Sequence, residues 1–142
     1  MERSDWTLLA VCFSGPKGLS PVQLQKSLFL LGAELQREVG HDFYTFIPHN
    51  YGPFSKQIYT DAEQLAANGL IAIEREPGSP AQYVITALGR NRALEVEREL
   101  SQRVQDYFAN VVTWTQQRSF SSLIRSIYEK YPEYRVNSVF QY

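Results

Sequence analysis

The first apolar run of the chain has the length and the borders of a helix. It extends over residues 6–13, and Asp5 stands before it as an expected N-cap. Gly15-Pro16 follows, a pair that ends helices because proline and glycine both disfavour their continuation. We therefore expect a first helix over residues 5–13.

A leucine stripe predicts the second helix. Ser20-Pro21 opens it, as an N-cap residue followed by proline at the first helical position, and Gly40 ends it. Spacings of four, three and four residues place one set of leucines on a single face. This stripe, expected to be buried against the third helix, consists of Leu24, Leu28, Leu31 and Leu35.

In the middle of the chain the pattern changes from helical to extended and then to a turn that precedes a third helix. Residues 43–47 are aromatic and β-branched, and they predict a short strand or an extended segment. Residues 50–55 predict a turn that ends in the N-cap Ser55. The third helix is expected from Lys56 to Asn68, stopped by Gly69. Its expected inward residues are Ile58, Ala62 and Leu65.

The remaining pattern predicts a hairpin and two helices. Residues 70–74 and 83–86 form the expected strands, with the turn residues 77–80 between them. Thr86 is expected to cap a long helix, and residues 120–130 to form the last one, before Pro132. One side of the long helix would carry Leu94, Leu100, Val104, Tyr107, Phe108 and Val111.

This order of elements predicts an α+β, mainly helical fold. Three helices followed by a β-hairpin is the order of a winged helix, in which the third helix is the recognition element and the hairpin is the wing. Two C-terminal helices would follow. Without a repeat or a linker, residues 1–142 are interpreted as one domain, with a core over residues 5–87 and a helical extension over residues 88–142.

Charge and cysteine content restrict the function. Lys and Arg number 14 against 15 Asp and Glu, a balance that lacks the basic excess of a dedicated DNA-binding domain. The single cysteine, Cys12, excludes an internal disulfide and a cysteine-based zinc site, and its apolar neighbours predict a buried, inert thiol. No stretch has the composition of a signal peptide or a membrane span, so we expect a cytoplasmic protein.

No group of residues has the spacing of a catalytic or metal site. His41 and His49 are seven apart without a carboxylate helix motif around them, and no glycine-rich phosphate loop is present. We expect no enzyme activity, no metal and no cofactor.

Three blocks together resemble a known family. They are residues 24–31 (LQKSLFLL), residues 51–55 (YGPFS) followed by the helix that ends in LAANGLI, and residues 83–89 (YVITALG). In this order they resemble the winged-helix group related to the Panacea (SocA-like) antitoxin domain. The resemblance covers about residues 6–96, and residues 124–138 resemble a tail of some relatives. It departs at residues 47–50, where the family usually has a tryptophan, and at Phe54, where it has a valine.

The resemblance implies a non-enzymatic module that binds another protein, such as an antitoxin, an adaptor or a defence-system regulator. Its partner would be a toxin or another effector protein. We place the partner-binding face around the turn and the start of the third helix, where tyrosines offer apolar area and a hydrogen bond. The alternative is that the aromatic residues are core. The candidate face is Tyr51, Phe54, Lys56, Gln57 and Tyr59.

The alternative function is a DNA-binding transcriptional regulator, which would need a dimer to gather enough positive charge. A homodimer through the C-terminal helices is possible, because the tail is rich in tyrosine: Tyr128, Tyr131, Tyr134 and Tyr142. Asp61 and Glu63 on the third helix would repel phosphates, whereas Arg90 and Arg92 are taken as the least neutralised cations. The candidate nucleic-acid contacts are Lys56, Gln57, Thr60, Gln64, Arg75, Arg90 and Arg92.

Overall fold

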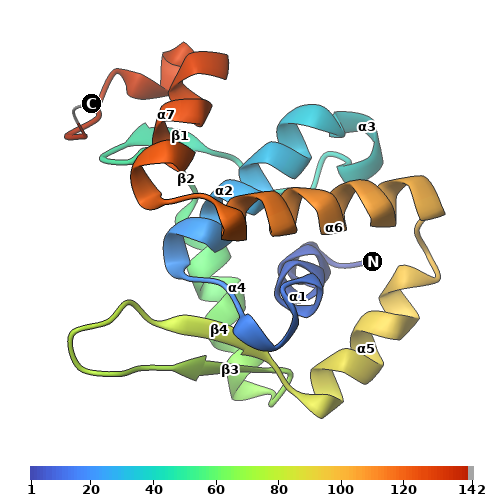
Figure 1. Ribbon diagram of the computed structural model, residues 1–142. Helices are drawn as coiled ribbons and strands as arrows, with labels where there is room; N and C mark the ends of the chain where they lie inside the picture. The colour runs from blue at the N-terminus through green and yellow to red at the C-terminus, as the bar shows by residue number, and fades with distance from the viewer. Residues whose placement is uncertain (141–142) are drawn as a thin grey trace.

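The computed structural model of the chain describes residues 1–140 and shows an α+β, mainly helical protein with two small antiparallel hairpins (Figure 1). Within these residues, no helix combines the length and the apolar character that crossing a membrane requires. The elements are α1 (Arg3–Phe13), η1 (Gly15–Lys17), α2 (Pro21–Glu34), α3 (Gln36–Val39), β1 (Ile47–His49), β2 (Gly52–Phe54), α4 (Lys56–Ala67), β3 (Ile71–Glu74), β4 (Gln82–Ile85), α5 (Ala87–Glu97), α6 (Gln102–Gln117), α7 (Phe120–Lys130) and η2 (Pro132–Arg135).

Helix α1 lies in the middle of the molecule. Every residue from Asp5 to Val11 is buried, so no side of this helix faces water over almost two turns. A helix that is buried all round needs a neighbour on each face. Those neighbours are α2, α4, α5, α6 and β4 (Figure 1).

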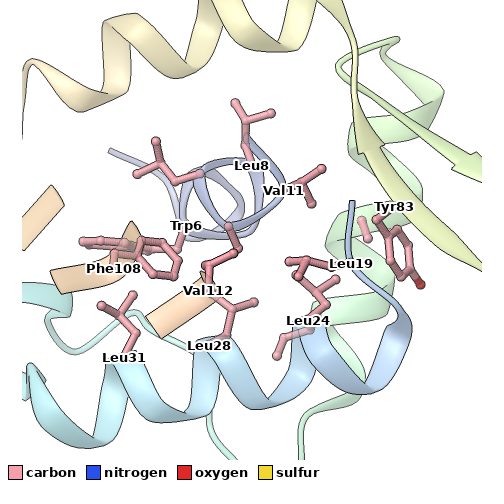
Figure 2. Close-up of a cluster of buried hydrophobic side chains, with 14 of the residues drawn as sticks. Trp6, Leu8, Val11, Leu19, Leu24, Leu28, Leu31, Tyr83, Phe108 and Val112 are labelled. Carbon is pink, nitrogen blue, oxygen red and sulfur yellow. The ribbon is translucent and has the colours of Figure 1, made fainter. Parts of the chain in front are cut away.

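The leucine stripe of α2 is buried as predicted, but its partners are different. Figure 2 shows Leu24, Leu28 and Leu31 directed toward α1 and toward Phe108 and Val112 of α6. The expectation that the stripe lies against the third helix, α4, is therefore wrong. The sequence pattern identifies a buried face but not what covers it.

The contact between α2 and α6 also contains a polar pair. Ser27 and Thr115 are both buried, and their hydroxyl oxygens lie 2.9 Å apart, within hydrogen-bond distance. Thr115 donates onward to the carbonyl oxygen of Val112. The hydroxyls are thus satisfied inside the core, where an unpaired hydroxyl would destabilise the fold.

The strand predicted at residues 43–47 lies elsewhere. Strand β1 begins only at Ile47 and pairs with β2, with Ile47 opposite Phe54 and His49 opposite Gly52. The block expected to be a turn therefore supplies a strand. Residues 43–46 are irregular instead, and Phe43 and Tyr44 pack their rings into the core beside Trp6.

The second hairpin agrees with the prediction. Strands β3 and β4 pair antiparallel with Ile71 opposite Ile85, and Leu19 adds an isolated bridge to Tyr83. In Figure 1 this hairpin projects away from the helices, and residues 75–80 at its tip are exposed.

The junction of the hairpin with α5 depends on Thr86 and Gly89. The Thr86 hydroxyl lies within hydrogen-bond distance of the carbonyl oxygens of Gly69 and Leu70, at 2.7 and 2.9 Å, and it accepts from the backbone N–H of Gly89. A Cβ at Gly89 would lie 1.8 Å from the Leu70 carbonyl oxygen. Only glycine lets α5 approach β3 this closely.

The long helix expected after Thr86 is two helices. Helix α5 ends at Glu97, and Ser101 begins α6 by accepting a hydrogen bond from the N–H of Val104. The break turns the chain back across α1, so that α5 and α6 cover different sides of it (Figure 1). Leu94, expected on the inner face, is 51% exposed.

Two other helix borders differ from the prediction. Asp5 lies in the first turn of α1 rather than before it, and its carboxylate accepts from the N–H of Glu2 as part of a capping box. The second helix is interrupted at Leu35, after which the short α3 continues to Gly40.

The C-terminal segment packs on α2 and on the first hairpin. Leu123 and Ile127 of α7 form a second apolar cluster with Phe29, and the rings of Tyr131 and Tyr134 lie against Phe29. Two backbone contacts hold the following residues on the hairpin: Val139 N–H donates to the Asn50 carbonyl oxygen and the Asn137 side chain to that of Pro48. Tyr128 is buried, and Tyr142 lies outside the described residues.

Replacing Leu28 by alanine tests this core. The side chain is fully buried between α1 and α6, so we expect Leu28→Ala to lower the free energy of unfolding by about 2–5 kcal/mol. Leu94→Ala, at an exposed position, is the matched control and should change it by less than about 0.5 kcal/mol. Denaturant unfolding measures both, and equal stabilities of the two variants would contradict the assignment.

Candidate functional site

A pocket of about 200 Å³ opens where α2, the first hairpin and α4 meet. Aromatic side chains form much of its wall. The ring of His49 stacks on Phe54, with 4.7 Å between the centroids, and Phe54 meets Tyr59 edge-on at 5.7 Å. We call this the aromatic pocket, and it is lined by Val22, Gln25, Lys26, His49, Asn50, Tyr51, Gly52, Phe54 and Tyr59.

Gln25 connects the floor of the pocket to the start of α4. Its amide nitrogen donates to the carbonyl oxygen of Ser55 at 2.8 Å, and its amide oxygen accepts from the N–H of the same residue at 2.9 Å. Both ends of this double contact are buried. Gln25 thus pairs with the Ser55 backbone as a neighbouring strand would. It accepts from the buried N–H of Ser55 and is a second donor to the carbonyl oxygen, which also accepts from the N–H of Ile58 at 3.3 Å.

Lys26 is the most unusual residue of the pocket. Its side chain is buried, with an exposed fraction of 3% for the residue, and its Nζ donates to the carbonyl oxygen of Pro53 at 2.9 Å. Among the described residues no carboxylate pairs with it. Burial disfavours the charged amine and lowers the pKa of Lys26 to about 7.

Gly52 allows the hairpin to approach α7. Its φ is +95°, a backbone conformation that residues other than glycine rarely adopt. A Cβ here would also lie 3.3 Å from the Tyr128 ring, tighter than ordinary contact. Gly52 and Pro53 therefore shape the backbone that presents Tyr51 and Phe54 on either side of them.

The five residues predicted to bind a partner lie close together, but they differ in exposure. Tyr51 is 43% exposed and contacts the ring of Phe120, whereas Phe54 and Tyr59 are half-buried. Burial raises the pKa of Tyr59 to about 12. Lys56 and Gln57 are exposed on the first turn of α4. The pocket wall and the exposed start of α4 thus form one continuous candidate surface.

The residues predicted to contact nucleic acid lie on three elements: α4, α5 and the second hairpin. Lys56, Gln57, Thr60 and Gln64 are all exposed on the outer side of α4, opposite the buried Ile58, Ala62 and Leu65. Arg90 is exposed on α5, and Arg75 on the second hairpin pairs with Glu63 at 3.7 Å.

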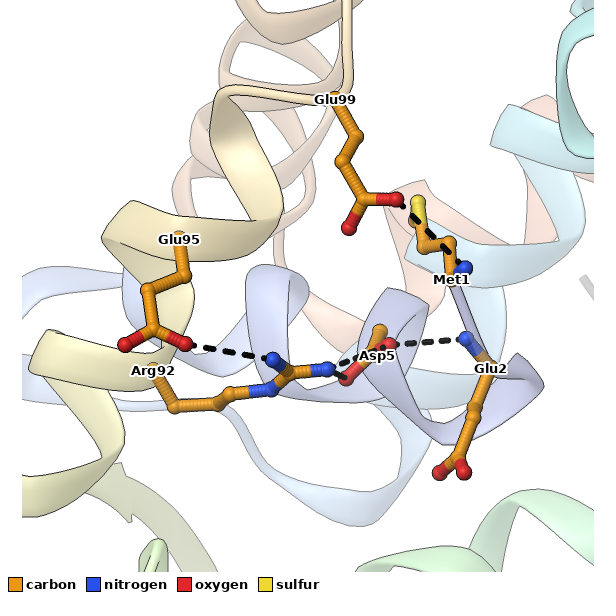
Figure 3. A network of polar contacts seen from close by, with 6 residues as sticks. All are labelled: Met1, Glu2, Asp5, Arg92, Glu95 and Glu99. Atoms are coloured by element: carbon orange, nitrogen blue, oxygen red, sulfur yellow. Dashed lines mark hydrogen bonds and ion pairs between the residues drawn. The ribbon is translucent and has the colours of Figure 1, made fainter.

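Arg92 is not among the least neutralised cations, and that prediction is wrong. Its guanidinium lies 3.2 Å from the buried carboxylate of Asp5 and 3.3 Å from that of Glu95 (Figure 3). Asp5 requires this partner, because a buried carboxylate without a cation would be costly. Arg92 therefore holds α5 on the start of α1 and is not available to a phosphate.

Asp61 was expected to repel phosphates from the outer face of α4, but it lies on the inner side. Its carboxylate accepts two hydrogen bonds from Arg3, at 2.9 and 3.1 Å, and one from the Tyr44 hydroxyl at 2.7 Å. Tyr44 in turn lies 2.6 Å from the Thr7 hydroxyl. Glu63, paired with Arg75, remains on the exposed side.

Two other kinds of candidate chemistry are a metal site and a reactive cysteine. No group of three or more His, Cys, Asp or Glu within residues 1–140 is arranged to hold a metal ion. Cys12 is half-buried rather than fully buried, and burial raises the pKa of its thiol, which makes it less reactive. His49 lies on the pocket wall.

Sequence reasoning did not place Gln25 and Lys26 in the site. Both lie in residues 24–31, which predict a helix with a leucine stripe and carry part of the family resemblance. A signal was present, since two long polar residues, Gln25 and Lys26, sit between Leu24 and Leu28 on a helix with buried faces. Polar residues at such positions need a defined partner.

Comparisons with known proteins were made for the whole chain. No protein-family model matches it, and no curated protein matches it at a significant level.

Gln25→Leu tests the contact between α2 and the start of α4. The change keeps the side-chain size but leaves the N–H of Ser55 without its partner, at a cost of about 1–3 kcal/mol. The Ser55 carbonyl oxygen loses one donor and still accepts from the N–H of Ile58. We expect a clear fall in the free energy of unfolding. Gln117→Leu, at an exposed position, should have little effect. If the two variants unfold at the same denaturant concentration, Gln25 does not hold this junction.

Proposed function

We propose that this protein is a winged-helix module that works by binding another protein, through the aromatic pocket and the exposed start of α4. Its partner would be a toxin or another effector, and its role that of an antitoxin, adaptor or regulator. The observation that carries the proposal is the single surface formed by Tyr51, Phe54, Lys56, Gln57 and Tyr59 around a pocket.

The order and contacts of the elements support a winged helix. Helices α1, α2 and α4 precede the β3–β4 hairpin, and the Leu19–Tyr83 bridge adds a third short segment to that hairpin, an arrangement typical of this fold. The three blocks that resemble the Panacea-related group also meet in space. Gln25 contacts Ser55, and Thr86 contacts Gly69. These contacts support the proposal that the chain is related to that group.

The properties of the surface support protein binding. It combines half-buried aromatic rings with an exposed tyrosine and long polar side chains, as protein interfaces do. Phe54 and Tyr59 are already held in place by packing, so little side-chain freedom would be lost on binding.

Tyr51→Ala and Tyr59→Ala test the surface together with site-specific photo-crosslinking. A crosslinking residue at Gln57 should capture one partner protein from cells of the source organism, and a crosslinking residue at the exposed Arg98 should not. We expect Tyr51→Ala to lose capture with a nearly unchanged melting temperature. Tyr59→Ala should also lose some stability, because its ring is partly buried.

Two outcomes would count against the surface. If the residue at Gln57 captures nothing that the residue at Arg98 does not, the surface is not the interface. If Tyr51→Ala destabilises the fold as much as a core variant does, Tyr51 is a structural residue.

The second candidate function is DNA binding by a dimer. It is favoured by one observation, the exposed row of Lys56, Gln57, Thr60 and Gln64 on α4, from which Asp61 is turned away. It is weakened by the charges. Arg92 and Arg75 are both paired with carboxylates, which leaves few cations for phosphates.

Fluorescence anisotropy with mixed-sequence duplex DNA separates the two functions. We expect no detectable binding by the monomer at physiological salt, because the net charge is −1. Sub-micromolar binding that weakens steeply with salt, and that Lys56→Ala reduces, would favour the second candidate instead. A Lys17→Ala variant, at an exposed position far from α4 in sequence, controls for the loss of one charge.

A further inference from the structure

Lys26 brings an amine into the aromatic pocket, and none of the carboxylates of residues 1–140 is paired with it. We infer that the aromatic pocket receives the carboxylate side chain of an aspartate or glutamate of the partner protein and pairs it with Lys26. The inference rests on the proposed function, and it names the chemistry of the residue that the surface recognises.

The first argument is the missing counter-charge. A buried ammonium group is costly unless it is paired and hydrogen-bonded. Lys26 has one hydrogen bond, to Pro53, although an ammonium has three donors. Within the part of the chain that the structure describes, the titratable residues that line the pocket with it are His49, Tyr51 and Tyr59, and Tyr128 of α7 lies beside Gly52. None of these four is a carboxylate.

The second argument is size. The pocket volume of about 200 Å³ is several times the roughly 30 Å³ that one water occupies in the liquid. It is smaller than the range of about 300–1,000 Å³ typical of small-molecule and cofactor sites. A single side chain with its first carbons therefore fits better than a complete ligand.

The third argument is the nature of the walls. The rings of Phe54 and Tyr59 and the side chain of Val22 give the lining apolar area, which lowers the local dielectric and strengthens an ion pair formed in the pocket. A phosphate is best bound by several donors or by a forked guanidinium, but the pocket lining contains no arginine. A single lysine beside apolar rings matches one carboxylate.

Titration with three short peptides tests the inference by NMR on protein with labelled lysine side chains. Ac-Ala-Glu-Ala-NH2 carries the carboxylate, and Ac-Ala-Gln-Ala-NH2 is the uncharged match. At saturating concentration, the first peptide should raise the pKa of Lys26 by at least about one unit, which corresponds to tenfold tighter binding to the charged amine. The second should leave it unchanged. Ac-Ala-Gln-Ala-OH tests a chain-terminal carboxylate, and a response to this peptide alone would overturn the side-chain assignment.

The pH dependence gives a second readout. The pKa of the Lys26 amine in the unliganded protein is about 7. The affinity for the glutamate peptide should therefore fall as the pH rises from that value to the raised pKa of the complex, by about tenfold in total for each unit of pKa shift. Lys26→Met should bind weakly and without this dependence, whereas Lys17→Met, which removes an exposed lysine, should behave as wild type. A dependence that persists in Lys26→Met would assign the effect to another group and overturn the inference.

The outcomes also separate this inference from the proposed function. Equal responses to the glutamate and glutamine peptides overturn the role of Lys26, even if partner capture at Gln57 succeeds. A glutamate response without any captured partner supports the pocket chemistry and contradicts the proposed function. If Lys26→Met fails to fold, the peptide pair on the wild-type protein still decides.

Discussion

The structure depends on covering one helix completely. Helix α1 is buried over seven successive residues, from Asp5 to Val11, so the fold is stable only when neighbours close on every side of it. Those neighbours come from both halves of the chain: α2 and α4 from the first, α5 and α6 from the second. Phe108 and Val112 of α6 are therefore part of the same apolar cluster as Leu24 and Leu28. Helices α5 and α6 therefore contribute side chains to the core itself. Arg92 of α5 also compensates the charge of Asp5 on α1.

The three sequence blocks that resemble the Panacea-related group have a shared physical meaning. Each supplies one side of a junction: Gln25 and Lys26 hold the backbone of residues 53–55, and Thr86 holds that of residues 69–70. Residues at these junctions are restricted by geometry, because an amide must both donate and accept, and Gly89 must admit a carbonyl oxygen. The three blocks therefore have a structural role first, because their contacts determine how helices α2, α4 and α5 are joined to the rest of the fold. Lys26 differs from the others, since it is a buried amine with which no carboxylate among the described residues is paired.

Elements with a strong local signal could be predicted from the sequence. The buried face of α4, the paired strands β3 and β4, and helix α7 all follow from periodicity and turn residues, and the structure confirms them. The elements that were predicted wrongly are those whose structure depends on tertiary contacts. Residues 43–46 look like a strand but lack one to pair with, and the break before Ser101 exists because α6 must cross α1. The candidate site was predicted in part: Tyr51 and Phe54 were found through their turn, but the partners of Gln25, Lys26 and Arg92 lie too far along the chain for any local pattern to reveal.

The base of the β3–β4 hairpin is held by the Leu19–Tyr83 bridge, by Thr86 and by the buried side chains of Ile71 and Ile85. The tip, residues 75–80, is exposed on a hairpin that projects away from the helices. Doubling the length of a flexible loop costs only about 0.6 kcal/mol in closure entropy. The length of this hairpin is therefore almost independent of the stability of the rest of the protein. Its tip can become longer, shorter or differently charged during evolution while α4 and the aromatic pocket keep their structure.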